Sequence, residues 1–121
     1  RDMWHKYLMI TVLSSVTTLM HAPIGPIRDS EGGKPYIEAM YQEVASIMQA
    51  HQAPISEDIV KRYMMSLDNL SYHFKTSMQS NMERGLNIQG YILSLANQYD
   101  FPAPLLTSVY QNLNVYNEML S

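Results

Sequence analysis

The 121-residue chain contains no cysteine, which excludes a disulfide framework, a thiolate metal site and a cysteine nucleophile. Charged residues are also sparse, at 16% of the chain, whereas 46% of the residues are hydrophobic. This composition argues against disorder and predicts one folded domain with a sizeable core. A chain without cysteine also fits the cytoplasm, which we expect as its location.

Clusters of positive charge are missing as well. Eight lysines and arginines against eleven aspartates and glutamates give a formal net charge of −3 with neutral histidines. Because nucleic-acid binding normally needs a basic patch, we expect no nucleic-acid partner. The histidines show neither HxH nor HExxH spacing, so we expect no metal site either. They are His5, His21, His51 and His73.

The chain also lacks an apolar run long enough to cross a bilayer. Its most apolar stretch is MWHKYLMITVLSSVTTLM at residues 3–20, and only the part from Tyr7 to Met20 is free of charge. This part contains several serines and threonines and is shorter than the roughly 18 to 20 residues that a span needs. We therefore predict a buried helix from about Asp2 to Met20 and no membrane contact.

Proline and glycine divide the rest of the chain into further helices. Segment 22–35, APIGPIRDSEGGKP, cannot be helical throughout, and a second helix is predicted from Pro35 to about residue 50. Ser56 is predicted to cap the next helix, and others are predicted near 76–85, over 87–99 and after 100–104. No segment alternates with period two for long enough to form a strand. The sequence thus predicts one all-α domain of about six helices over residues 1–121.

The helical spacing of apolar residues predicts which faces are buried. In the second helix these residues are Ile37, Met40, Tyr41, Val44, Ile47 and Met48. In the helix over 87–99 they are Ile88, Tyr91, Ile92, Leu95 and Tyr99.

A lysine interrupts the apolar opening run. Lys6, Ile10, Ser14 and Thr17 share one face of the predicted helix, at spacings of four, four and three. A lysine on such a helix ordinarily extends its ammonium to solvent while its stem covers apolar surface. The functional alternative is a lysine that faces a cleft and donates a hydrogen bond or a proton there.

Two hydroxyl residues, Thr76 and Ser77, stand where a helix is predicted to begin. One of them can cap that helix by accepting a hydrogen bond from a backbone amide. The same position can instead hold a carboxylate, because free amides and the positive end of the helix dipole point at it. The residues alone leave both interpretations open.

Several segments together resemble a known family. In order, they are W-x-K at residues 4–6, APIGPIR, MYQEVASIMQAHQAPISEDIV, KTSMQSNMERG and YDFPAPLLTSVYQNL. This series is similar to the C-terminal helical domain of ketopantoate reductases (2-dehydropantoate 2-reductases) over nearly the whole chain. The resemblance implies an N-terminal dinucleotide-binding domain of the GxGxxG type outside these residues, which binds NADPH. We therefore interpret the chain as one domain of a longer enzyme and expect this domain alone to be inactive.

The resemblance also implies roles for individual residues. Lys6 matches the family lysine beside the substrate ketone, where an ammonium stabilises the developing alkoxide and supplies a proton. Ser77 matches a serine that contacts the substrate, and Thr76 adjoins it at the same helix start. Ser14 stands where the family commonly has an asparagine, so we expect it to help position the substrate.

Two departures from the family pattern affect the substrate. Ile10 also replaces a common asparagine, and its side chain cannot form a hydrogen bond. A family glutamate, expected about a dozen residues after Ser77, has no counterpart between Gly85 and Gly90. Either this glutamate is absent or it belongs to a loop after Gly85 that is missing from the sequence, and we favour the second interpretation.

We therefore expect NADPH-dependent reduction of ketopantoate or a similar 2-keto acid, on the route to pantothenate and coenzyme A. A homodimer through helical faces is compatible with this expectation. Two alternatives stay open, and the first is a related β-hydroxyacid dehydrogenase. The second is a non-catalytic helical interaction module, for which the ten methionines and nine tyrosines could supply the surface.

Overall fold

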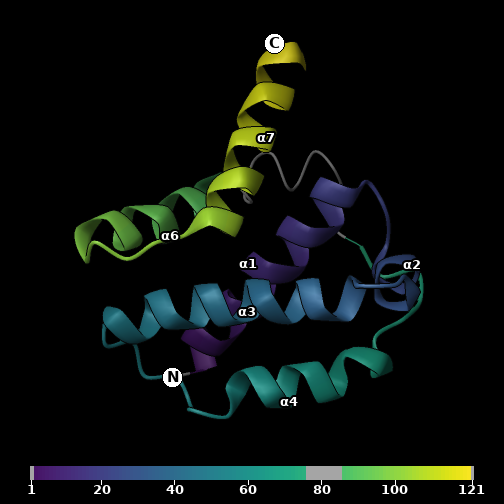
Figure 1. Ribbon diagram of the computed structural model, residues 1–121, viewed down its shortest axis with the longest axis horizontal. Coiled ribbons are helices and arrows are strands. Elements are labelled where there is room, and N and C mark those ends of the chain that lie inside the picture. Colours follow the sequence, from purple (N-terminus) through teal and green to yellow (C-terminus); the bar gives the residue numbers. More distant parts are fainter. Residues whose placement is uncertain (1, 76–85, 121) are drawn as a thin grey trace.

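Figure 1 shows the computed structural model of the protein, which describes residues 2–75 and 86–120. Within these residues the chain forms six α-helices, one 3₁₀ turn and no strand, so the all-α prediction is confirmed. The elements are α1 (Asp2–Met20), α2 (Ile24–Asp29), α3 (Gly33–Ala50), α4 (Ile59–Ser66), η1 (Leu67–Asn69), α6 (Leu86–Gln98) and α7 (Pro104–Leu120). The helix predicted near 76–85 lies outside the described residues.

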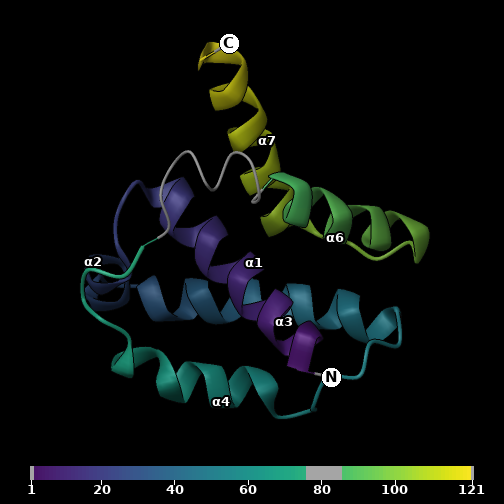
Figure 2. The same cartoon turned by 180° about the vertical axis from the view of Figure 1, so that it is seen from behind.

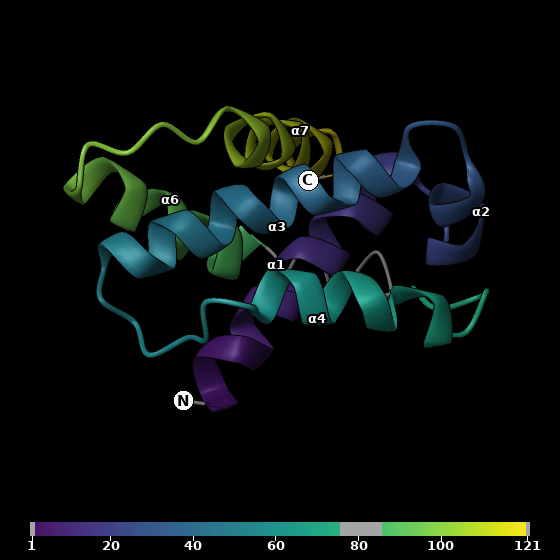
Figure 3. The same cartoon turned by 60° about the horizontal axis from the view of Figure 1, so that its bottom comes forward.

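The helices are arranged around α3. Helix α1 crosses α3 on one face, as the view from behind shows (Figure 2), and α4 runs beside α3 at its lower edge (Figure 1). Figure 3 brings α4 forward and shows α6 and α7 on the opposite side of α3. Helix α1 packs against α2, α3, α6 and α7, in agreement with its prediction as a buried helix.

The opening helix has the predicted bounds, and its second half is the most deeply buried part of the chain. Every residue from Thr11 to Thr18 is buried. The helix tolerates polar residues here partly because the hydroxyls of Ser15 and Thr17 donate to carbonyls one turn back. Thr17 Oγ1, for example, donates to Leu13 O at 2.8 Å. Among the described helices, none has the length and apolarity that crossing a membrane would require.

The predicted core face of α3 is confirmed, whereas that of α6 is partly wrong. All six residues predicted to face inward on α3 are buried. Tyr91 of α6 is 46% exposed and Tyr99, which follows the end of the helix, is 39% exposed, whereas Gln89 and Ala96 are buried. The buried face of α6 is therefore rotated toward Gln89. Tyrosine tolerates the resulting exposure because its hydroxyl can meet water.

The short helix α2 within APIGPIR was not predicted. Its first amides are satisfied by a distant segment, because Ile24 N–H donates to Phe74 O at 2.8 Å and Gly25 N–H donates to Tyr72 O at 2.9 Å. The two backbones approach so closely that a Cβ on Gly25 would lie 2.3 Å from the Tyr72 ring. Glycine is therefore required at this position.

The predicted N-cap at Ser56 is wrong, because α4 begins at Ile59 and has no side-chain cap. The backbone N–H of Ser56 instead donates to His5 Nε2 at 3.0 Å, which holds this segment against α1. Glu57 and Asp58 consequently form a turn before the helix and are not its first residues.

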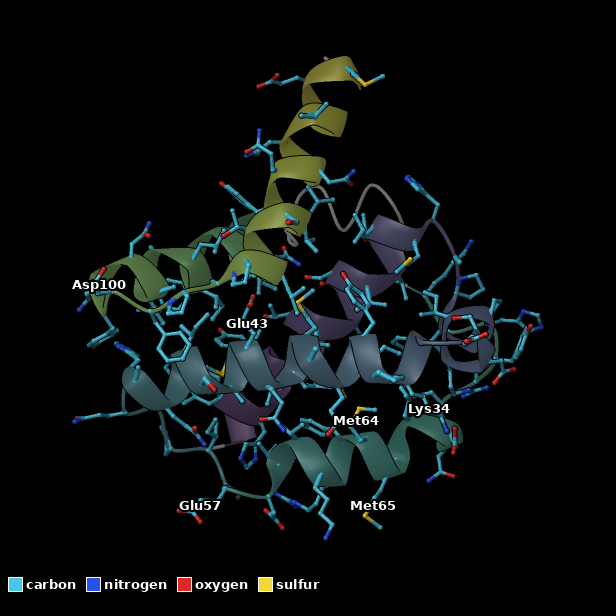
Figure 4. All side chains as sticks on the ribbon, in the orientation of Figure 1. Lys34, Glu43, Glu57, Met64, Met65 and Asp100 are labelled. Atoms are coloured by element: carbon cyan, nitrogen blue, oxygen red, sulfur yellow. The ribbon has the colours of Figure 1, made fainter. Side chains whose placement is uncertain are left out.

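The last helix begins after the predicted break and is capped from another helix. Glu43 of α3 accepts hydrogen bonds from Leu105 N–H at 3.1 Å and from Leu106 N–H at 2.7 Å, one on each carboxylate oxygen. The negative charge of this carboxylate also lies next to the positive end of the α7 dipole, which is a stabilising arrangement. Figure 4 shows Glu43 on the side of α3 that faces α6 and α7.

Candidate functional site

Lys6 lies in the second turn of α1 and is exposed. Its neighbours on the open side of the helix are apolar, since Met3 is 54% exposed, Tyr7 is 38% exposed and Ile10 is half-buried. None of the described carboxylates forms an ion pair with its ammonium. The structure thus presents a single cation on an apolar surface, which we call the Lys6 face (Met3, Lys6, Tyr7 and Ile10).

Hydrogen bonds to the preceding residue fix the turn that carries Lys6. His5 O accepts a hydrogen bond from the Tyr63 hydroxyl of α4 at 3.0 Å. The ring of the same histidine accepts the Ser56 N–H on its Nε2 atom. Because Tyr63 of α4 bonds the backbone of His5 and the segment before α4 bonds its ring, the direction in which Lys6 leaves the helix is set by contacts from outside α1.

Aromatic rings hold the other side of this turn. Trp4 makes an edge contact with His51 at the end of α3, with ring centroids 5.7 Å apart, and another with Tyr7 at 6.1 Å. His51 Nδ1 is hydrogen-bonded to the Tyr99 hydroxyl at 2.8 Å. The ends of α3 and α6 therefore meet the start of α1 through one continuous aromatic contact.

Ser14 lies two turns beyond Lys6 on the same side of the helix but is only 3% exposed. Its Oγ atom accepts a hydrogen bond from Gln89 Nε2 at 3.2 Å. Sequence reasoning did not find Gln89, which is fully buried. The sequence signal that could have indicated such a residue is the run of serines and threonines in α1, because buried hydroxyls normally have hydrogen-bond partners and a neighbouring helix can supply one.

Of the four predicted site residues, Lys6 and Ser14 both lie on α1. Thr76 and Ser77 lie outside the described residues. The roles of all four therefore remain predictions.

Two other kinds of site were considered among the described residues. No group of three or more histidine, aspartate or glutamate side chains could hold a metal ion there. An open groove lies between α3 and α4, and no residue of α1 lines it. Its lining residues are Lys34, Pro35, Glu38, Gln42, Lys61, Met64 and Met65. Figure 4 shows Met64 between the two helices and Met65 on the outer side of α4.

Two tyrosines of α3 have raised pKa values. Burial, with a smaller contribution from the neighbouring Tyr63, raises the pKa of Tyr41 well above its ordinary value. Burial, followed by the negative charge of Glu43, raises the pKa of Tyr36. Both shifts arise from packing in the helical core and keep these phenols neutral.

Comparison with known proteins identifies the fold and its family. A family model described as the C-terminal domain of ketopantoate reductase (PanE/ApbA) matches residues 1–117. The chain belongs to the ketopantoate reductase family. The resemblance inferred from the ordered sequence segments is thereby confirmed.

Two individual proteins extend this result. The uncharacterized oxidoreductase YkpB of Bacillus subtilis (strain 168) is 30% identical over 121 residues, covering 96% of this chain and 40% of that protein. The solved structure of a dimeric ketopantoate reductase from Staphylococcus aureus has a TM-score of 0.86 and 20% identity, covering 100% of this chain and 44% of that chain. This ketopantoate reductase domain thus spans less than half the length of either relative.

Proposed function

We propose that the domain is the substrate-binding half of an NADPH-dependent reductase of ketopantoate or a similar 2-keto acid. The observation that carries the proposal is the Lys6 face, where a lysine that pairs with none of the described carboxylates stands on exposed apolar surface. A cation in such surroundings gains most when a negatively charged ligand covers it, because the low local dielectric strengthens the attraction. Membership of the ketopantoate reductase family supports this interpretation.

In the proposed reaction Lys6 assists the reduction of the ketone. NADPH, held mainly by a dinucleotide-binding domain of the complete protein, supplies the hydride to the carbonyl carbon. As the carbon–oxygen π bond breaks, negative charge develops on oxygen, and the Lys6 ammonium stabilises it and then transfers a proton. The product is a 2-hydroxy acid. The contacts of His5 with Ser56 and with Tyr63 of α4 hold the turn of Lys6 in place during this step.

Ile10 bears on which 2-keto acid is reduced. It lies one turn from Lys6, is half-buried and offers no hydrogen bond to a ligand. The surface beside Lys6 therefore favours an apolar substituent at this position. An Ile10→Asn variant should shift the preference toward 2-keto acids with a hydroxylated side chain, as ketopantoate has.

The complete protein is further proposed to form a homodimer, to lie in the cytoplasm and to act on the pathway to pantothenate and coenzyme A. The structural relative from Staphylococcus aureus is dimeric, which supports the first of these. The last turns of α7 extend beyond the other helices (Figure 1) and carry Val115 and Met119, 48% and 79% exposed. Such an apolar helix end is suitable for contact with a second copy.

The test begins with the intact denatured mass of the polypeptide and continues with a substrate panel. A mass larger by about 15 to 20 kDa would correspond to an attached dinucleotide-binding domain. The complete protein is then assayed with several 2-keto acids and either NADPH or NADH. Faster reduction with NADPH is expected for at least one 2-keto acid. Oxidation of 3-hydroxy acids alone would favour a β-hydroxyacid dehydrogenase, and a tight protein partner without any turnover would favour the interaction module.

A further inference from the structure

One amide side chain from α6 enters the core beside α1. Gln89 lies in the first turn of α6 and is fully buried. Its Nε2 atom donates to Ser15 Oγ at 2.6 Å and to Ser14 Oγ at 3.2 Å, and Thr11 O lies 3.4 Å away. These are contacts between helices that are more than seventy residues apart in the sequence.

The two serines are left with different hydrogen-bonding capacities. Ser15 Oγ donates to Thr11 O at 2.5 Å, so its proton is committed to the helix. Ser14 Oγ is 3.4 Å from the same carbonyl oxygen, which is long for a hydroxyl donor. Gln89 already occupies an acceptor position on Ser14. The proton of Ser14 is therefore the one that remains available to another acceptor.

Stability alone does not account for an amide at this position. Gln89 Oε1 and Thr11 Oγ1 are buried, and neither has a hydrogen-bond partner among the residues that the structure describes. A buried acceptor without a partner destabilises the folded state, because it has lost its bonds to water. An apolar side chain of similar length would fill the same space without this cost. Such incompletely satisfied polar groups are characteristic of functional sites.

We infer that Gln89 is a positioning residue for substrate binding. By donating to Ser14 Oγ, its amide turns Ser14 into a hydrogen-bond donor toward the substrate. A 2-keto acid has only acceptor oxygens at its ketone and carboxylate, so donors are what its binding surface must provide. The inference rests on the proposed function, because it requires a 2-keto acid in contact with the side of α1 that carries Lys6 and Ser14.

A double-mutant cycle in the complete reductase tests this role, with the best substrate of the panel. The variants are Ser14→Ala, Gln89→Met and the two combined. Each single variant should raise KM about tenfold, the effect of one lost hydrogen bond, and change kcat much less. Because Gln89 acts through Ser14, the double variant should be no worse than Ser14→Ala alone. Gln89→Leu serves as a second apolar replacement if methionine does not fit.

The melting temperature separates positioning from structure. Gln89→Met should change Tm little, because the loss of the hydrogen bonds that Gln89 donates is offset by the removal of a buried acceptor that pairs with none of the described groups. Gln98→Met is the matched control, since it makes the same change at an exposed position of α6 and should leave both KM and Tm unaltered.

Each contrary result has its own meaning. A normal KM in Gln89→Met, or effects that add in the double variant, would overturn the positioning role while the reductase function stands. A lowered Tm with unchanged KM would show that Gln89 is purely structural. Normal kinetics in Ser14→Ala would remove Ser14 from the site and Gln89 with it. If the unmodified complete protein reduces no 2-keto acid, the proposed function fails first and this inference fails with it.

Discussion

The two halves of α1 differ in nearly every respect, although they form one uninterrupted helix. The first half presents exposed apolar residues and the cation of Lys6. In the second half every residue from Thr11 to Thr18 is buried. The first half is positioned by hydrogen bonds and aromatic rings from the ends of other helices, and the second by core packing. A helix can thus anchor itself with one half and expose a charged side chain with the other.

The largest effect is expected from Lys6→Ala in the complete reductase. The variant should lower kcat by about 10²- to 10⁴-fold, because in the proposed reaction Lys6 stabilises and protonates the alkoxide. Tm should not change, since the side chain is exposed. Lys61→Ala, an exposed lysine of α4, is the control. Near-normal turnover in Lys6→Ala would exclude this residue from the mechanism and erase the functional difference between the two halves.

Leu13→Ala should have the opposite pattern. Leu13 is 2% exposed, and its truncation leaves a cavity in the core, so the free energy of unfolding should fall by about 2–5 kcal/mol. Urea denaturation measures this change, and kcat per folded molecule should stay the same. Met3→Ala in the exposed half should alter the unfolding free energy by less than about 0.5 kcal/mol. Equal losses of unfolding free energy in Leu13→Ala and Met3→Ala would contradict the difference between the two halves of α1.

Alkaline pH should weaken the fold through Tyr41. Its pKa in the folded chain is raised above the ordinary value of 10.0, so the unfolded chain releases this proton at lower pH than the folded chain does. The contribution of neutral Tyr41 to the free energy of unfolding is fully present below pH 10.0 and is lost as the pH rises toward the pKa in the folded chain. Unfolding free energies measured on both sides of pH 10.0 should therefore decline less steeply in Tyr41→Phe. Some decline should remain, because the pKa of Tyr36 is also raised.

The smallest effect is expected from Thr11→Val. Thr11 Oγ1 is buried and has no partner among the described residues, so replacing it with a methyl group of similar size should leave the unfolding free energy unchanged or raise it by up to about 1 kcal/mol. Ser15→Ala is the informative comparison, because it deprives Gln89 of its shortest hydrogen bond. If Thr11→Val proved the more damaging of the two by calorimetry, the hydroxyls of the buried half would need a different explanation.

Local sequence patterns predicted those parts of the fold that depend on local interactions. The bounds of α1 and the buried face of α3 follow from apolar spacing alone. Helix α2 could not be predicted in this way, since Ile24 and Gly25 depend on the carbonyls of Tyr72 and Phe74. The same reason explains the error at Ser56, whose amide is taken by His5.

The candidate site was predictable to a similar extent. The position of Lys6 on an apolar helix face is visible in the sequence, and the resemblance to ketopantoate reductases gave it a role. The near burial of Ser14 and its contact with Gln89 depend on how α6 packs against α1, and no pattern within either helix contains that information.

The carboxylate of Glu43 holds the start of a long helix whose other end is free of the helical core. It accepts hydrogen bonds from two backbone amides in the first turn of α7, while the far end of that helix extends away from the other helices (Figure 1). A 17-residue helix is about 25 Å long, so a small rotation at its start displaces its far end by several times the movement near Glu43. The direction in which the free end of α7 points therefore depends on the Glu43 hydrogen bonds at its start, together with the packing of α7 against α1, α3 and α6.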